Sequence, residues 1–366
     1  MRAAEKLTTR SEALQKTAEE LLLATSAWRN SHPCVLSIYG PGSREDEVYV
    51  QRVPTEAAAG TAVDEVLREL GFHVERVTPD VTNLAERISS ADFVFINAHG
   101  DMGECGRIQG LCDIMRTPYT GSGLLGSAVC LQKDFLSTFA RGLGFSVPAQ
   151  LLLQSSSIED DMPLIKRMLA AVLKPARGGS SVGLRVIKDI HDFASIQEER
   201  QSWPAVLEEY IVGQDVTLGM IQYGTRLELL PPLIIDTASS LYGEDEKMSG
   251  HWRGEVRYAT TEVPSSDWLG GIRIKVRSLV EKINLRGAIR FDFRISSKGE
   301  PFLLEVNTNP GISREGNLSL AARAAGLGFH RLIAMLALLA SYDDPYTGKV
   351  ISLTSLLGLN KDRLSD

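Results

Sequence analysis

The stretch RFDFRISSKGEPFLLEVN, residues 290–307, decides the fold of this 366-residue chain. Apolar and charged residues alternate in both of its halves, which predicts two β-strands, and the short polar segment between them predicts a tight turn. Residues two apart in a strand face the same side of the sheet. Arg290 and Asp292 therefore share one face of the first strand, as Glu305 and Asn307 do in the second. The hairpin should gather two acids, an amide and an arginine.

This gathering of oxygen ligands predicts a metal site. Carboxylate and amide oxygens suit Mg²⁺, which keeps positions open for water and phosphate oxygens. The alternative is a solvent-exposed sheet face lined with polar residues. Apolar neighbours such as Phe291 and Leu303 indicate buried strands, however, and a buried acid needs a partner. The predicted metal ligands are Asp292, Glu305 and Asn307.

The composition is that of a globular protein of two or three domains, with 43% hydrophobic and 23% charged residues. A net charge of −7 argues against a nucleic-acid-binding protein. No apolar run reaches about 18 residues and no signal peptide is evident, so a cytoplasmic protein without a membrane segment is expected. The spacing of the four cysteines suits neither a zinc site nor a disulfide framework.

Alternating strand and helix patterns between residues 34 and 115 predict an α/β layer with a parallel sheet. Within it, Thr55 is a plausible helix N-cap and Gly71 a helix stop. Residues 168–188 read instead as a β-hairpin. The long polar stretch 237–258 is a candidate functional loop, and residues 317–340 are predicted as one helix.

Two further patterns suggest a nucleotide site. In KPARGGSSVG, Lys174 ends a strand and the following glycine–serine loop can fold over a phosphate with its backbone N–H groups, although an ordinary flexible turn is the alternative. In LEEYIVGQD, Glu208 and Glu209 end a strand where they can accept hydrogen bonds from adenine or ribose, or simply be solvated. Neither segment is a Walker A motif.

Two other features have the pattern of a binding site. GSGLLG, residues 121–126, matches a dinucleotide-binding glycine pattern, but no clear strand precedes it, and we reject that interpretation. His99 ends a predicted strand at the sheet edge where ligands of α/β proteins bind, and a buried structural histidine is the alternative.

Taken together and in order, several motifs resemble those of D-alanine–D-alanine ligases, members of the ATP-grasp superfamily. The motifs lie between Val35 and Ala340 and are GPGSREDEV, AHGDMGECGRIQG, TPYTGSG, KPARGGSSVG, RFDF, LLEVNTNPG and AARAAG. The resemblance implies an ATP-grasp fold of three α/β domains, here with an N-terminal helical extension. The expected divisions are a helical extension at 1–31, an N-terminal substrate domain at 32–131, a central domain at 132–212, a C-terminal catalytic domain at 213–345 and a tail at 346–366.

The resemblance also implies a reaction. ATP phosphorylates the carboxylate of a first amino acid, and the amine of a second attacks the acyl phosphate to form an amide, with ADP and phosphate as products. It implies ATP and Mg²⁺ as cofactors, with two ions expected and Mn²⁺ able to substitute. The expected partners are small amino acid substrates and a second copy of the chain in a homodimer.

Residue roles follow from the same resemblance. The positions that match the family's nucleotide contacts are Lys133, Lys174, Ser180, Ser181, Glu208, Glu209, Ile211 and Asp215. Arg290 and the Gly311 N–H match donors to the tetrahedral oxyanion, and Ser180 matches a residue of the loop over the γ-phosphate. Glu45 matches the acid that receives the first ammonium group, with His99 nearby.

The chain departs from the family pattern around the substrates. Met248 falls near the position of a loop tyrosine in the family, with His251 close by, and Gly178 replaces an acid of the glycine–serine loop. Gly316 and Asn317 stand where the family has a serine and a leucine that hold the second substrate.

These departures favour a substrate pair other than two D-alanines, with Arg314 as a possible anchor for an acceptor carboxylate or phosphate. The alternatives are a true D-alanine–D-alanine ligase of cell-wall synthesis and an inactive nucleotide-binding regulatory protein.

Overall fold

The computed structural model describes residues 33–41, 54–154, 158–178, 183–199, 204–223, 226–236, 257–259 and 268–342. The predicted N-terminal helical extension and the C-terminal tail lie outside these residues. The site candidates outside them are Glu45, Ser180, Ser181, Met248 and His251. His99 is described only as backbone.

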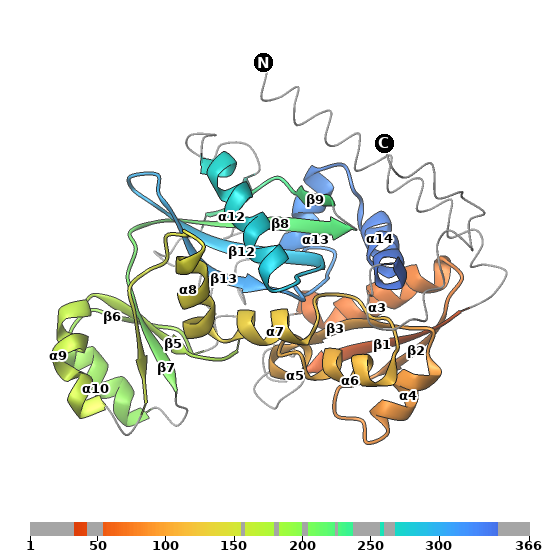
Figure 1. The fold of residues 1–366 in the computed structure, drawn as a ribbon, viewed down its shortest axis with the longest axis horizontal. Coiled ribbons are helices and arrows are strands. Elements are labelled where there is room, and N and C mark those ends of the chain that lie inside the picture. Colours follow the sequence, from red (N-terminus) through yellow and green to blue (C-terminus); the bar gives the residue numbers. More distant parts are fainter. Residues whose placement is uncertain are drawn as a thin grey trace, which may run out of the picture.

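The N-terminal unit is a parallel three-stranded sheet in the order β2-β1-β3, which confirms the predicted α/β layer (Figure 1). Its strands are β1 (Cys34–Pro41), β2 (His73–Val77) and β3 (Phe93–His99). Its helices are α3 (Pro54–Glu69), α4 (Leu84–Ser90), α5 (Gly100–Glu104) and α6 (Arg107–Met115). Helix α3 begins at Pro54, so Thr55 lies in its first turn and is not the N-cap.

Helices α7 (Leu124–Leu131) and α8 (Lys133–Gly142) lead from this unit to the central one, which contains an antiparallel sheet in the order β4-β7-β5-β6. The elements of the central unit are β4 (Gln150–Leu153), α9 (Ile158–Met168), β5 (Ala171–Pro175), β6 (Arg185–Ile187), α10 (Ile190–Glu199) and β7 (Ala205–Glu209). Strands β5 and β6 pair antiparallel, which confirms the predicted hairpin around the glycine–serine loop.

The C-terminal unit is a six-stranded sheet in the order β11-β10-β8-β12-β13, with β9 paired to β8. Its strands are β8 (Gly213–Tyr223), β9 (Arg226–Leu229), β10 (Leu233–Asp236), β11 (Arg257–Ala259), β12 (Gly287–Ser296) and β13 (Pro301–Asn307). The β12–β13 hairpin is the predicted one, and a register shift falls between Asp292 and Phe293. Helix α12 (Trp268–Lys282) belongs to the same unit.

The single helix predicted for residues 317–340 is wrong, because the chain forms α13 (Asn317–Ala324) and α14 (Phe329–Tyr342). Gly326 adopts a φ of 79°, which ends α13 in the left-handed region that favours glycine. The Leu327 N–H then donates to the Ala322 carbonyl at 2.8 Å. The two axes differ by 105°. Among the described helices none alone is long and apolar enough to cross a membrane, and only this bent pair passes by length and composition.

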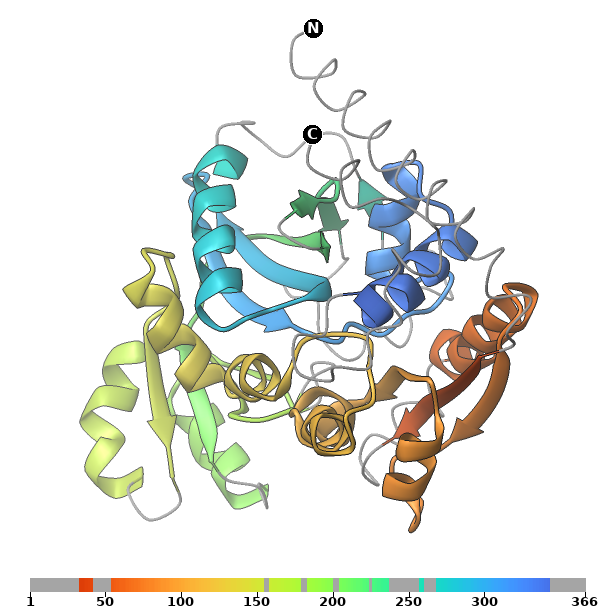
Figure 2. The ribbon, with the colours of Figure 1, turned by 45° about the vertical axis from the view of Figure 1, so that its right-hand side comes forward.

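The N-terminal and C-terminal units share one hydrophobic core. Side chains of α3 and of the first sheet, such as Leu67 and Phe93, belong to the same buried cluster as Leu318 and Leu336 of α13 and α14. The central unit has its own cluster, which includes Leu173 and Phe193. In Figures 1 and 2 the central unit accordingly stands apart as a yellow and green lobe, while the other two units pack side by side.

Candidate functional site at the junction of the three units

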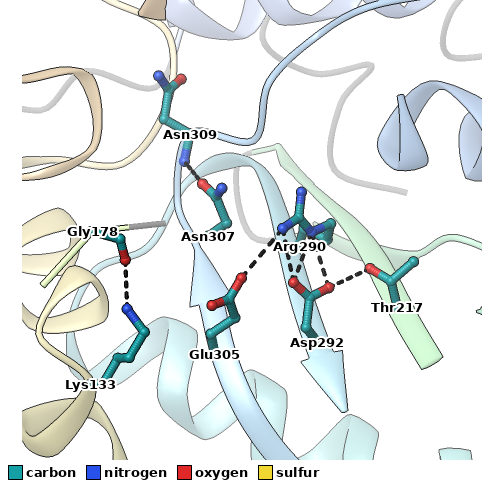
Figure 3. A network of polar contacts seen from close by, with 8 residues as sticks. All are labelled: Lys133, Gly178, Thr217, Arg290, Asp292, Glu305, Asn307 and Asn309. Carbon is teal, nitrogen blue, oxygen red and sulfur yellow. Dashed lines mark hydrogen bonds and ion pairs between the residues drawn. The ribbon is translucent and has the colours of Figure 1, made fainter. Parts of the chain in front are cut away.

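The β12–β13 hairpin forms one wall of the site (Figure 3). Asp292 lies directly opposite Glu305, and Arg290 lies opposite Asn307. Arg290 donates from Nε to both Asp292 oxygens, at 3.0 and 3.1 Å, and from Nη2 to Oδ2 at 2.8 Å. Its Nη2 also lies 3.5 Å from Glu305 Oε1. The hairpin thus brings together the acids and the arginine that the sequence placed on one face.

The charges of this wall are strongly coupled. Burial raises the pKa of Asp292 above its ordinary value; Arg290 opposes that shift and Glu305 adds to it. Burial disfavours the charge of Arg290, but Asp292 and Glu305 more than compensate and hold its pKa above the ordinary range. Thr217 on β8 completes the network by donating to Asp292 Oδ1 at 2.6 Å. Two carboxylates therefore face one guanidinium, an arrangement that favours an additional cation.

Asn307 is held in a fixed orientation by its own backbone turn. Its Oδ1 accepts the Asn309 N–H at 3.0 Å, as Figure 3 shows. A carbonyl oxygen has two lone pairs, so the same atom can still bind a cation. Asn307 lies at the end of β13, two residues beyond Glu305, where strand alternation turns both toward the same face.

The central unit and α8 form the opposite wall. Lys133 begins α8 and donates from Nζ to the Gly178 carbonyl at 2.5 Å, at the start of the glycine–serine loop. Lys174 on β5 forms an ion pair with Glu208 on β7, and both side chains are nearly inaccessible to solvent. Gln150 donates to Glu208 Oε1 at 3.3 Å. This wall therefore carries two ammonium groups against one buried carboxylate.

The pKa of Lys133 is lowered to about 8, mainly by burial and also by nearby Lys174, while Glu305 and Glu208 oppose the shift. Lys133 is only 7% exposed. A buried ammonium group gains from an anionic ligand, because the negative charge of the ligand favours the protonated form.

Between the walls lies a cleft of about 350 Å³, open solvent at its mouth included. Its lining residues are Glu104, Cys130, Leu131, Lys133, Gly178, Glu305, Val306, Asn307 and Thr308. Glu104 ends α5 of the N-terminal unit, so all three units contribute. Sequence reasoning had not singled out Glu104, although it lies inside the motif AHGDMGECGRIQG.

The other predicted nucleotide contacts lie at the end of β7 (Glu209), in the connection to β8 (Ile211) and in β8 itself (Asp215). Glu209 accepts the Ala149 N–H at 3.3 Å. Arg294 on β12 binds the remaining two positions: its Nη1 lies 2.8 Å from Asp215 Oδ2, and its Nε donates to the Ile211 carbonyl at 3.0 Å. Arg294 is 5% exposed. Sequence reasoning missed it, and a charged residue facing inward from an apolar strand was the available clue.

The segment after β13 holds the predicted second-substrate positions. Arg314 lies 4.8 Å above the Phe329 ring and 3.9 Å from Glu65 Oε2, so it reaches toward α3 and α14. Gly316 caps α13, and a Cβ at that position would stand 2.9 Å from Ser313 Oγ.

These observations define a class of protein. Three α/β units, with a cleft between a lysine-bearing wall and an acid-bearing hairpin, form an enzyme of the ATP-grasp class. Residues 147–337 match the family model described as D-ala D-ala ligase C-terminus. The D-alanine–D-alanine ligase of Aquifex aeolicus is 31% identical over 305 residues, covering 82% of this chain and 99% of the relative. The D-alanine–D-alanine ligase of Stutzerimonas stutzeri is 30% identical, and the match covers 82% of this chain and 91% of the relative. The chain therefore belongs to the D-alanine–D-alanine ligase family.

Solved structures agree on the fold. The D-alanine–D-alanine ligase from Bacillus anthracis complexed with ATP superposes with a TM-score of 0.69 at 22% identity, covering 84% of this chain and 96% of that one. The VanG D-Ala:D-Ser ligase from Enterococcus faecalis gives 0.70 at 20% identity, covering 84% and 99%.

Proposed function

We propose that this protein joins the carboxylate of one amino acid to the amine of another, at the expense of ATP and through an acyl phosphate. The observation that carries the proposal is the Arg290–Asp292–Glu305 network at the edge of the cleft. A protein that only bound nucleotide would have no need of a fixed guanidinium beside its acids. This network therefore favours an enzyme over an inactive regulatory protein.

Arg290 is the proposed electrostatic catalyst. Its Nε and Nη2 are fixed by Asp292, while its Nη1 makes no hydrogen bond to any described residue. Nη1 is thus available for the oxyanion that develops when an amine attacks the acyl phosphate. The backbone N–H of Gly311 is the proposed second donor. Donors fixed before the reaction stabilise developing charge without reorganising.

Lys133 and Lys174 are the proposed phosphate contacts, from the wall of the cleft that carries excess positive charge. The adenine and ribose are proposed to lie along the β7–β8 connection, where Glu208, Glu209, Ile211 and Asp215 provide acceptors. Ser180 and Ser181, outside the described residues, are proposed to cover the γ-phosphate.

The residues of the hairpin fit Mg²⁺. Asp292, Glu305 and Asn307 offer oxygen ligands to a cation. Burial raises the pKa of Asp292 and the nearby charge of Glu305 adds to the shift, so the ionised pair gains from a cation. These residues would bind one or two Mg²⁺ ions, which would neutralise the negative charge of the phosphates. Mn²⁺, which also prefers oxygen ligands, is an expected substitute.

We further propose that the acceptor differs from D-alanine. A Cβ at position 316 would stand 2.9 Å from Ser313 Oγ, which would have to move, and Gly316 offers no hydroxyl to an acceptor. The proposed first-substrate contacts are Glu45 and His99, and the proposed acceptor-side positions are Met248, His251, Gly316 and Asn317. Arg314 as an acceptor anchor is less favoured, because it already stacks on Phe329.

The test is a screen of paired D- and L-amino acids with ATP and Mg²⁺, read by mass spectrometry for condensation products and by phosphate release. We expect a dipeptide-like amide together with ADP and phosphate. AMP and pyrophosphate would rule out the acyl-phosphate route. A strong preference for two D-alanines would support the cell-wall ligase instead, and no product from any pair would favour the regulatory alternative.

A further inference from the structure

Asn97 connects the N-terminal unit to the segment that follows the catalytic hairpin. Its Oδ1 accepts the Ile312 N–H at 3.0 Å, and its Nδ2 donates to the Ile312 carbonyl at 3.4 Å. The two residues are 215 positions apart, and both are buried, at 2% and 3% exposure. Asn97 lies on β3, opposite Tyr39 of β1.

This pair of hydrogen bonds fixes the backbone next to Gly311. The Ile312 nitrogen belongs to the planar peptide that begins at Gly311, so holding the Ile312 N–H fixes that plane. The Ile312 carbonyl fixes the next plane along the chain. On the other side of Gly311, Thr308 donates to Ser127 Oγ of α7 at 3.2 Å, and the Asn309 N–H is bound by Asn307. Gly311 therefore lies between two anchored points.

An asparagine is suited to this position. Its amide offers one acceptor and two donor hydrogens in one plane, so it satisfies a backbone N–H and a backbone C=O together. A leucine of similar size satisfies neither, and an ionised aspartate satisfies only the N–H. The side chain is not needed to hold the two units together, because they already share the core around Phe93 and Leu336.

We propose that Asn97 is a positioning residue for the condensation step: it holds Ile312 by both backbone groups and thereby aims the neighbouring Gly311 N–H at the reacting carbonyl. The inference rests on the proposed function, which gives Gly311 its role.

The experiment compares Asn97→Leu with Ser122→Ala in the full-length chain. Ser122 is a matched control because its Oγ also makes two buried hydrogen bonds between the same two units, to the Arg286 carbonyl at 3.2 Å and from the Arg286 N–H at 3.1 Å. Those bonds are made to Arg286 and not to Ile312 or Gly311. The Ser122 carbonyl, which accepts from Ser127 Oγ at 3.4 Å, is retained in Ser122→Ala. Both variants should lose a similar amount of thermal stability. Only Asn97→Leu should lose kcat, by about 100-fold, the scale expected when a reacting group is misplaced by about 1 Å.

The KM for ATP should stay within about twofold in both variants, since no nucleotide contact changes. Asn97→Asp, which keeps the acceptor, should fall between wild type and Asn97→Leu. A kcat loss shared by Ser122→Ala, or full activity in Asn97→Leu, would overturn the inference while leaving the proposed function intact. A wild-type protein without ligase activity would instead overturn the proposed function, and the inference with it.

Hydrogen exchange of the wild-type protein provides a second measurement that does not depend on how the variants fold. A proteolytic peptide spanning residues 308–316 should contain a strongly protected amide, that of Ile312. Complete exchange of this peptide as fast as an exposed loop would show that Asn97 does not hold the segment, and would overturn the inference.

Discussion

The two walls of the cleft carry opposite excess charge. On the hairpin, Asp292 and Glu305 face Arg290, so acids outnumber the guanidinium by two to one. On the central wall, Lys133 and Lys174 face Glu208, so ammonium groups outnumber the carboxylate by two to one. The two walls are therefore suited to different parts of the ligand. The lysines can bind phosphate oxygens directly, whereas the acids can bind a phosphate only through a divalent cation. Four changes test this division, taken from the largest expected effect to the smallest.

Arg290→Met should have the largest effect. It removes the proposed oxyanion donor and leaves two acids without their guanidinium, so kcat should fall by about 10²–10³-fold. Steady-state kinetics with saturating ATP measures this. Arg294→Met is the matched control, because Arg294 is a buried arginine on the same strand that pairs with Asp215 instead. Equal kcat losses in the two variants would refute a special role for Arg290.

Asp292→Asn tests the negative wall. An amide keeps the shape but removes the charge that would hold the cation, so the Mg²⁺ concentration for half-maximal activity should rise by at least about 10-fold. Titration of activity with Mg²⁺ measures this. Glu300→Gln, an exposed acid at the turn of the same hairpin, should leave the titration unchanged. An unaltered Mg²⁺ requirement in Asp292→Asn would exclude Asp292 as a metal ligand.

Arg294→Met tests the β7–β8 connection, which links the central unit to the C-terminal sheet. It leaves Asp215 and the Ile211 carbonyl without their partner, and charged hydrogen bonds of this kind are worth about 1.5–3 kcal/mol. We expect the KM for ATP to rise by about tenfold with little change in kcat. Arg294→Lys should recover part of the affinity for ATP, because lysine restores the positive charge but not the planar set of donors of a guanidinium. Loss of kcat at constant KM would assign Arg294 to the chemistry instead.

Lys133→Arg should have the smallest effect, which is a change in the pH dependence of kcat/KM for ATP. Its ammonium group is charged below its pKa of about 8 and neutral above it, so phosphate attraction weakens as the pH rises. The kcat/KM for ATP, which reports the free enzyme, should therefore fall through pH 8. Lys133→Arg keeps its charge and should abolish that inflection. A profile identical in the two proteins would assign the inflection to another group.

Much of the site could be predicted because its geometry is local. The β12–β13 hairpin follows from alternation and a short turn, and it carries Arg290, Asp292 and Glu305 to one face without reference to the rest of the chain. The β5–β6 hairpin was predicted for the same reason. Helix ends were harder: the prediction ran through Gly326, which adopts a left-handed φ just beyond α13 and is followed by the buried Leu327.

The contacts of Arg294 and Arg314 could not be predicted in this way. Arg294 lies on β12 and Arg314 follows β13, and the sequence suggested a ligand role only for Arg314. In the fold, Arg294 turns inward to Asp215, while Arg314 stacks on Phe329 at the surface. The direction of a long side chain depends on which partners the packed units bring within reach, and those partners are distant in sequence.

The sequence alone indicated the alternation of strand and helix in the N-terminal unit, the two hairpins and the acids on one face of the β12–β13 hairpin, because these depend on residue periodicity and short turns. It did not indicate β2 or α4. Tertiary structure alone decided which units share a core, how the opposite charges come to face each other and how Asn97 reaches Ile312. The physical reason is the distance along the chain. A hydrogen bond between residues 215 positions apart forms only after the two units have packed, and no local sequence pattern predicts that packing.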